Sequence, residues 1–225
     1  MSSPVRTIPP LRDGERLTRE EFELRYHAMP EVKKAELIDG VVHMPSPVHA
    51  LAHGNPHGQV VTWLGVYSAA TPGVMVFCDT TTRILPEGEP QPDAMLVRVS
   101  GGTAHLDPDD YVAGCPELVA EVAASSVSID RGAKRRDYER AGVQEYVLFL
   151  MEEERVEWYI LRNQGYELVI ANSANALRSE VFPGLWLDTD AFFQRNLAQV
   201  LTTLQQGLAS PEHAAFVTQL AGGQP

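Results

Sequence analysis

Residues 116–150 read PELVAEVAASSVSIDRGAKRRDYERAGVQEYVLFL and carry the strongest fold signal in the chain. Positions 118–122 form a short apolar run of the kind that a sheet buries on both faces. A polar loop follows, and residues 131–140 have a helical composition that ends at Ala141-Gly142. A second apolar run covers residues 143–150. The pattern of strand, loop, helix and strand predicts a domain that combines helices with a β-sheet.

Glu121 interrupts the first of these apolar runs. A lone carboxylate in a buried strand costs on the order of several kcal/mol unless a cation or hydrogen bonds compensate it. A metal ion is one such cation, and the following helix offers another. We expect Asp130 to cap this helix and Lys134 to lie in its first turns. Because the helix packs back over the end of the strand, Lys134 is placed to reach the site of Glu121.

Asp93 repeats this pattern upstream, where Pro92-Asp93 opens the apolar strand 94–97. We expect Asp93 at the beginning of the strand or in a bend. A strand carrying Asp, a strand carrying Glu and then a Lys is the order of a metal-dependent phosphodiesterase site. In such a site two carboxylates hold Mg²⁺, which generates hydroxide and offsets charge on the phosphorus centre, while the ammonium group assists.

Three stretches resemble the Uma-type family of restriction endonucleases, which belongs to the PD-(D/E)XK nuclease superfamily. They are ELIDG at 36–40, PDAMLV at 92–97, and Glu121-Val122 followed by residues 130–146. The resemblance covers about residues 15–190. The order and spacing of the stretches carry the resemblance, since no single motif is specific on its own.

Two positions depart from the superfamily pattern. The superfamily lysine usually lies two residues after the Glu, where this chain has Ala123. In the Uma-type family the lysine lies on the following helix, which is where Lys134 falls. Relatives tend to have a Ser-Pro-Ser-like turn where this chain has Ala124-Ser125-Ser126. That second departure concerns the geometry of the loop and leaves the charged residues in place.

The resemblance implies an α/β (α+β) fold with a restriction-endonuclease-like mixed central sheet flanked by helices. It implies a Mg²⁺-dependent endonuclease, with Mn²⁺ able to substitute, that hydrolyses phosphodiester bonds of nucleic acid, DNA in the first place. Asp93, Glu121 and the main-chain carbonyl of Val122 would hold the metal. Glu36 would complete the acidic shell or orient a water molecule, and Lys134 would assist the attacking water. By analogy the products carry a 5′-phosphate and a 3′-hydroxyl.

The net charge of −12 argues against a protein that coats DNA, because such proteins are basic. A nuclease needs only a local basic patch, and five of the 18 basic residues lie within positions 131–140. The alternative is a solvated helix face on which Asp137 and Glu139 partner these charges. The nucleic-acid contacts that we expect are Arg131, Arg135, Arg136 and His49.

Histidines are concentrated between two proline-rich segments, at His43, His49, His53 and His57. The last three are four residues apart, which on a helix would align them as zinc ligands. Residues that interrupt helices lie among them, namely Pro45, Pro47, Gly54 and Pro56. We therefore expect Asn55 to cap a helix over 57–70, with His49 at the mouth of the site and the others in loops.

The remaining elements follow from local signals. Thr18 and Glu21 form a capping box for a helix to about residue 28. Residues 35–43 predict a hairpin that turns at Asp39-Gly40. Further strands are expected at 74–78 with an extension through 80–82, and in a meander at 143–150, 155–161, 165–171 and 177–182. A helix should run from Asp188 or Thr189 to 208, and Asp107, Asp109 and Asp110 should be solvated loop charges.

The chain of 225 residues suggests an extended arm at 1–14, one domain at 15–208, and a tail or short helix at 209–225. No apolar run approaches the roughly 18 residues that span a bilayer, and the N-terminus lacks an apolar signal core. We expect a cytoplasmic protein with no membrane partner, in which Cys78 and Cys115 are free thiols. Superfamily members are often dimers, so we expect a homodimer.

Two other functions remain open from the sequence. The acidic net charge and the lack of a DNA-binding appendage fit a nuclease-like fold used as a non-catalytic binding or assembly module. The histidine cluster fits a zinc-dependent hydrolase. No GxSxG, P-loop, GxGxxG or CxxC motif occurs in the chain, so acyl transfer, nucleoside triphosphate and dinucleotide chemistry have no support.

Overall fold

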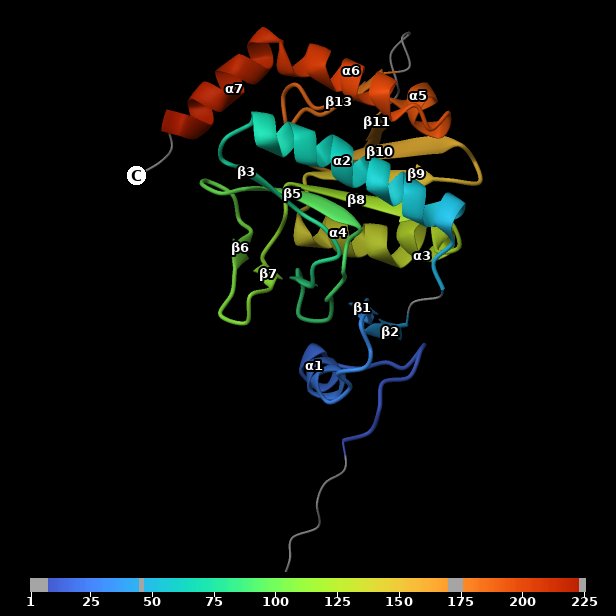
Figure 1. Cartoon of the computed structure of the whole chain (residues 1–225). Coiled ribbons are helices and arrows are strands. Elements are labelled where there is room, and N and C mark those ends of the chain that lie inside the picture. Colours follow the sequence, from blue (N-terminus) through green and yellow to red (C-terminus); the bar gives the residue numbers. More distant parts are fainter. Residues whose placement is uncertain (1–7, 45–46, 170–175, 223–225) are drawn as a thin grey trace, which may run out of the picture.

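The computed structural model describes residues 8–44, 47–169 and 176–222, and a mixed six-stranded sheet forms its centre (Figure 1). The strand order is β11-β10-β9-β8-β5-β3. The central neighbours β8 and β9 run parallel, whereas every other pair in this sheet is antiparallel. The strands are β3 (Val74–Phe77), β5 (Ala94–Arg98), β8 (Leu118–Ala123), β9 (Glu145–Leu150), β10 (Arg155–Arg162) and β11 (Gly165–Val169).

Helices cover both faces of this sheet, which confirms the expected fold class (Figure 1). One face packs against α2 (Asn55–Ala70) and α6 (Leu197–Leu208), and the other packs against α4 (Arg135–Ala141). Successive residues of a strand point to opposite faces. In β8, Ala120 and Val122 pack on the α2 side and Val119 and Ala123 on the α4 side. Glu121 therefore points towards α4, which positions it for a contact with that helix.

The crossover from β8 to β9 is one helical run, and it begins earlier than the sequence indicated. It comprises α3 (Val127–Ile129), a π-helical turn η2 (Asp130–Lys134) and α4. The expectation that Asp130 caps the helix was wrong, because Asp130 is itself helical with φ −66° and ψ −43°. The predicted end is confirmed, since Gly142 has φ 91° in the left-handed region.

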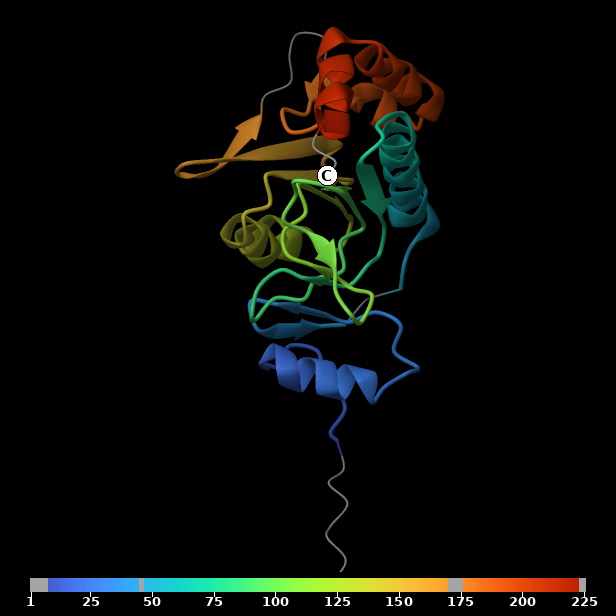
Figure 2. The same ribbon diagram turned by 90° about the vertical axis from the view of Figure 1, so that its left-hand side faces the viewer.

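A small N-terminal unit lies against one end of the sheet (Figure 2). It contains α1 (Arg19–His27) and the hairpin of β1 (Glu36–Ile38) and β2 (Val41–His43), as predicted. Thr18 caps α1 by accepting a hydrogen bond from the Glu21 N–H at 3.3 Å. The main-chain groups of Leu37 and Glu89 exchange two hydrogen bonds of 3.1 and 2.7 Å, and these attach the hairpin to the body. This attachment carries Glu36 to the sheet edge.

The segment after the proline-rich loop is helical where the sequence predicted a loop. A π-helical turn η1 (Ala50–Gly54) runs directly into α2, so Asn55 lies inside the helix and does not cap it. Pro56 falls at the start of α2, where its missing N–H costs little. His53 and His57 thus lie on consecutive helical turns, with ring centroids 5.6 Å apart.

Three further expectations were wrong in detail. Asp79 has φ 49°, which turns the chain, so residues 80–82 do not extend β3. Instead β4 (Thr82–Arg83) joins a small sheet with β7 (Val112–Ala113) and β6 (His105–Leu106). The C-terminal helix is interrupted at Arg195, which has φ 56°, into α5 (Thr189–Phe193) and α6. β12 (Ala176–Arg178) leaves the meander to pair with β13 (Trp186–Asp188).

The acidic loop and the C-terminal segment both contact the body. Asp107 and Asp109 form ion pairs with Arg83, so they are not simply solvated charges. The helix α7 (Pro211–Gly222) packs Phe216 against Phe182 of the main core, with ring centroids 6.2 Å apart. Residues 1–7 of the expected arm and 223–225 of the tail lie outside the described residues. No helix in the described part of the chain is long and apolar enough to cross a bilayer.

Two glycines of the crossover helix should respond in opposite ways to alanine. At Gly142 an added Cβ would meet only the Cys115 sulfur, at 4.0 Å, so there is room for a side chain. The positive φ of this residue is what disfavours alanine there. We predict that Gly142→Ala lowers the free energy of unfolding by about 1 kcal/mol. Gly132 lies within the helical run with open space around it, so Gly132→Ala should raise stability by about 0.5–1 kcal/mol. Urea denaturation measures both, and equal effects would contradict the helix boundaries.

Candidate active site

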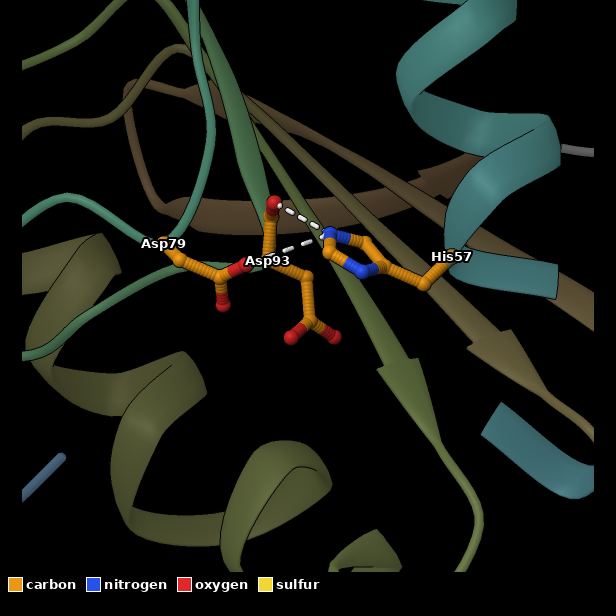
Figure 3. A group of neighbouring side chains, drawn as sticks. All are labelled: His57, Asp79 and Asp93. Atoms are coloured by element: carbon orange, nitrogen blue, oxygen red, sulfur yellow. Dashed lines mark hydrogen bonds and ion pairs between the residues drawn. The ribbon is translucent and has the colours of Figure 1, made fainter. Parts of the chain in front are cut away.

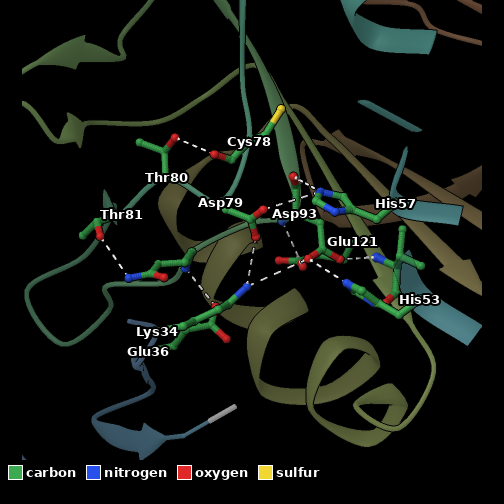
Figure 4. A network of polar contacts seen from close by, with 12 residues as sticks. Lys34, Glu36, His53, His57, Cys78, Asp79, Thr80, Thr81, Asp93 and Glu121 are labelled. Carbon is green, nitrogen blue, oxygen red and sulfur yellow. Dashed lines mark hydrogen bonds and ion pairs between the residues drawn. The ribbon is translucent and has the colours of Figure 1, made fainter. Parts of the chain in front are cut away.

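The four residues that the sequence proposed as catalytic come together at one edge of the sheet. Glu36 comes from β1, Asp93 precedes β5, Glu121 lies in β8 and Lys134 ends the π-helical turn η2. The Lys134 ammonium lies 2.9 Å from Glu36 Oε1 and 2.9 Å from Glu121 Oε1. Figure 4 shows Glu36, Asp93 and Glu121 converging from separate elements. Residues 98 positions apart in sequence, Glu36 and Lys134, thus form a direct ion pair.

Asp93 and Glu121 are fixed to each other by the backbone of the two strands. The Ala94–Ala120 pair is the last of the β5–β8 ladder before the site. Beyond it, the Val122 N–H donates to Asp93 Oδ2 at 2.7 Å, and the Asp93 N–H faces Glu121 Oε2 at 3.4 Å. Beyond the ladder, these main-chain N–H groups therefore face side-chain carboxylates instead of main-chain carbonyls. Their positions follow directly from the pairing of the strands.

Lys134 neutralises a group of buried acids that is larger than the sequence suggested. Asp130, one helical turn earlier, lies 3.7 Å from the Lys134 ammonium. The Tyr138 hydroxyl donates to Glu121 Oε1 at 2.8 Å. The Lys134 side chain is 4% exposed and so is that of Glu121. Burial at this level strengthens the attraction within each pair, but it also makes every uncompensated charge costly.

The electrostatics of the group follow from burial and from the excess of acid. Burial, opposed by Lys134 and reinforced by Asp93, raises the pKa of Glu121 to about 8. Burial also opposes ionisation of Glu36, but Lys134 and Lys34 outweigh it and lower the pKa of Glu36. Burial alone would lower the pKa of Lys134, yet the surrounding carboxylates raise it well above its usual value. Lys134 therefore stays charged near neutral pH, while burial raises the pKa values of both Glu121 and Asp130.

Lys34 lies at the open side of the site and was missed in the sequence. Its ammonium is 3.4 Å from Asp79 Oδ1 and 3.9 Å from Asp93 Oδ1 (Figure 4). Its side chain is 29% exposed, so Lys34, unlike Lys134, can contact a molecule arriving from solvent. The signal in the sequence was its place two residues before Glu36, since residues two apart in a strand share a face.

His53 and His57 also face the site and are not loop histidines. His53 Nδ1 lies 2.9 Å from the Val122 carbonyl oxygen, and its Nε2 lies 3.6 Å from Asp93 Oδ1. His57 Nε2 lies 2.9 Å from the Asp93 carbonyl oxygen and 3.8 Å from Asp79 Oδ2. Their spacing of four residues was the correct signal. It was set aside because the nearby prolines and glycine argued against a helix.

The four expected nucleic-acid contacts have different surroundings. Arg131 pairs with Glu153 at 2.9 Å and with Glu157 at 3.1 Å. The Arg135 guanidinium stacks over the Tyr159 ring at 5.1 Å from its centroid. Arg136 and His49 are exposed. Two of the four side chains therefore already hold partners within the protein, whereas Arg136 and His49 lie on the surface.

The donor set of the site fits a divalent cation. Five carboxyl groups face only two ammonium groups, those of Lys34 and Lys134, and this excess of negative charge calls for a further cation. The carboxyl groups are those of Glu36, Asp79, Asp93, Glu121 and Asp130. Asp93 Oδ1 lies 3.6 Å from His53 Nε2 and 3.9 Å from the Lys34 ammonium, and both distances are beyond hydrogen-bonding distance. The Val122 carbonyl, in contrast, already has His53 as a partner.

A second set of potential metal ligands adjoins the first. One ligand atom each from His57, Asp79 and Asp93 lies within 4.8 Å of the other two (Figure 3). Asp93 belongs to both sets. Residues of the site could therefore hold a cation on either side of the Asp93 carboxylate.

Comparison with known proteins identifies the family of the chain and supports the fold. Residues 19–190 match the family described as "Uma2: Putative restriction endonuclease". Among solved structures, the chain resembles a protein from Anabaena variabilis described as a putative nuclease belonging to DUF820. The two share 15% sequence identity and a TM-score of 0.58 over 76% of this chain and 96% of that chain, which shows a common fold. No curated protein matches.

Glu121 and Glu36 should have opposite effects on the metal-free protein. The pKa of Glu121 is about 8 in the folded chain against 4.5 ordinarily. Its stabilising contribution is therefore fully present below about pH 4.5 and is lost as the pH rises through about 8. We predict that Glu121→Gln raises the melting temperature at about pH 8, where the gain in unfolding free energy is on the order of 2 kcal/mol. Near pH 5 the gain should be smaller.

Glu36→Gln is the matched comparison, because the pKa of Glu36 is lowered and its charge stabilises the fold at neutral pH. This variant should melt below wild type at about pH 8. Both are measured by thermal denaturation in excess chelator. Destabilisation by Glu121→Gln at that pH would show that its ion pair with Lys134 outweighs the repulsion among the acids.

Proposed function

The chain belongs to the Uma2 family of restriction endonucleases, and from this premise we propose that it is a Mg²⁺-dependent endonuclease that hydrolyses phosphodiester bonds of DNA. One observation carries the proposal. Three carboxylates from three separate elements and one buried ammonium group converge, although a fold alone has no need of such an arrangement. Burying so many charges together is unfavourable unless a cation or a substrate uses them.

We assign the metal to Asp93 and Glu121, because Mg²⁺ prefers carboxylate oxygens. A divalent ion bound there would supply a Lewis acid that offsets charge developing on the scissile phosphate. Val122 could contribute its carbonyl oxygen as well, because this oxygen has two lone pairs and the contact with His53 at 2.9 Å uses only one of them.

The two lysines would have different tasks. Lys134 is held between Glu36 and Glu121 and would fix the orientation of both carboxylates. Lys34 is partly exposed and makes only long contacts with Asp79 and Asp93. An ammonium group in that position can move to a phosphate oxygen and stabilise its negative charge. Glu36, which accepts from Lys134 and from the Gln91 N–H at 2.8 Å, would orient the attacking water.

A non-catalytic binding or assembly module is the alternative, and specific contacts favour it too. The Glu121 oxygens face Lys134, Tyr138 and the Asp93 N–H. Arg131 of the basic segment is paired with Glu153 and Glu157. In such a module the charged group would serve only to fasten the N-terminal unit to the sheet. Cleavage assays separate the two functions.

We further propose that DNA contacts come from Arg136 and His49, whose side chains are exposed, and that the protein is a homodimer. The dimer proposal rests on the common behaviour of the superfamily. Trp186 and the C-terminal helices are its candidate apolar faces. Sedimentation equilibrium tests it, since a monomer at all concentrations would remove this part of the proposal.

Asp93→Asn is the most direct test of catalysis. The asparagine keeps the shape of the side chain and an acceptor for the Val122 N–H, but it removes the charge that binds the ion. We predict a loss of at least ~100-fold in the rate of plasmid DNA cleavage with Mg²⁺, at a melting temperature no lower than that of wild type. Gel electrophoresis of the cleavage products measures the rate.

Two further variants complete this experiment. Glu152→Gln alters an exposed acid of the loop between β9 and β10 and should cleave like wild type. Lys34→Ala should lower the rate while the fold is kept, because Lys34 is partly exposed. Equal cleavage by wild type and Asp93→Asn would mean that a contaminating nuclease produces the signal, and the non-catalytic module would then be the better description.

A further inference from the structure

His57, Asp79 and Asp93 form a group that the proposed Mg²⁺ site does not use in full. His57 lies in the first turns of α2, Asp79 in the turn after β3, and Asp93 in the bend before β5. Figure 3 shows the imidazole ring directed towards the Asp93 main-chain carbonyl and the Asp79 carboxylate, with the Asp93 carboxylate beside them. One ligand atom from each lies within 4.8 Å of the others.

The two oxygens of the Asp93 carboxylate have different neighbours. Oδ2 accepts the Val122 N–H at 2.7 Å and points back to β8. Oδ1 lies on the side of His53 and Lys34, at 3.6 and 3.9 Å. The carboxylate can therefore serve two neighbouring cations, one on each side.

A positive charge already lies at this place. The Lys34 ammonium is 3.4 Å from Asp79 Oδ1 and 3.9 Å from Asp93 Oδ1, so it bridges the two aspartates (Figure 4). These distances are longer than a good charge-assisted hydrogen bond of about 2.8 Å. The side chain is also partly exposed, which allows it to leave. A metal ion can take the place of a loosely held ammonium group.

The donor atoms indicate the class of metal. Mg²⁺ and Ca²⁺ bind oxygen ligands almost exclusively, whereas imidazole suits first-row transition metals. We propose that His57, Asp79 and Asp93 form a site for a divalent transition-metal ion, of the class of Mn²⁺, Co²⁺ or Zn²⁺, beside the Mg²⁺ site and sharing Asp93 with it. The inference concerns metal binding and does not depend on whether the chain cleaves DNA.

The geometry requires only a small rearrangement. His57 Nε2 and the Asp93 carbonyl oxygen are 2.9 Å apart, and two ligands around a metal ion are separated by roughly 3 Å when each bond is about 2.1 Å long. This carbonyl is thus a fourth potential donor. The Asp79 side chain is 53% exposed, so it can turn towards the ion. His57 would bind the ion through Nε2 as a neutral imidazole, with its ring proton on Nδ1.

His53 does not belong to this group of three residues. Its Nδ1 is held 2.9 Å from the Val122 carbonyl oxygen, which directs Nε2 towards Asp93 Oδ1 at 3.6 Å. The imidazole of His53 thereby orients the shared carboxylate. Removing His53 should disturb the site indirectly, so the test uses His57 and Asp79.

Co²⁺ binding to the full chain in excess Mg²⁺ tests the proposal, with visible absorption and titration calorimetry as readouts and no nucleic acid present. Wild type should bind Co²⁺ under these conditions, because Mg²⁺ competes poorly for a site with an imidazole. We predict that His57→Ala and Asp79→Asn each lower the Co²⁺ affinity at least ~10-fold. Affinity for Mg²⁺, measured without Co²⁺, should fall much less than the affinity for Co²⁺ in both variants.

His105→Ala is the matched control, since His105 is an exposed histidine of β6, and it should bind Co²⁺ like wild type. Asp79→Asn decides the matter if His57→Ala fails to fold, because Asp79 is half exposed. Wild-type Co²⁺ affinity in Asp79→Asn or in folded His57→Ala overturns the proposal. So does complete displacement of Co²⁺ by Mg²⁺ in wild type. An inactive nuclease that shows the expected Co²⁺ pattern leaves this inference standing and overturns only the proposed function.

Discussion

The ion pairs of Lys134 hold together parts of the chain that would otherwise have little reason to meet. The ammonium group joins Glu36 of the N-terminal hairpin, Glu121 of the central strand β8 and Asp130 of its own helical run. Removing one partner of a buried ion pair typically costs about 3–5 kcal/mol, because the remaining charge is left without compensation. The position of the hairpin and that of the crossover helix therefore depend on the same buried charge.

This dependence explains why the site is rigid in one part and open in another. Glu121 is fixed by Lys134 and Tyr138, and Asp93 by the Val122 N–H, so the shared floor of the site is set by the sheet. Lys34 and Asp79 lie at its open side and are partly exposed. Asp93 and Glu121 are held in place by the sheet, and the Lys34 ammonium beside them can move. This arrangement is suited to binding a cation together with an anionic substrate.

Sequence reasoning identified the buried carboxyl groups and Lys134 but missed the partly exposed residues around them. The pair of Glu121 and Lys134 could be predicted because a carboxylate in an apolar strand needs a cation and the next helix carried one. Asp93 could be proposed from its place before an apolar strand, whereas Glu36 needed the family resemblance as well, because the strand pairing that brings it to the site leaves no local mark in the sequence. His53 and His57 were missed for a different reason. Helix-breaking residues are read locally, whereas the π-helical turn before Asn55 is sustained by contacts with the body, such as that of His53 with Val122. Asp130 was misread likewise, since an acid near a helix start resembles a cap.

The central claim is that the carboxylates around Lys134 bind a divalent ion, and Mn²⁺ binding followed by the relaxation of water protons tests it most directly. The method requires no substrate and is blind to contaminating nucleases. The account predicts enhanced relaxation with wild type and its loss in Asp93→Ala, because Asp93 contributes to both proposed ion sites. Equal relaxation for the two proteins, or none with wild type, would contradict it and favour a nuclease-like fold that uses its buried charges only for assembly.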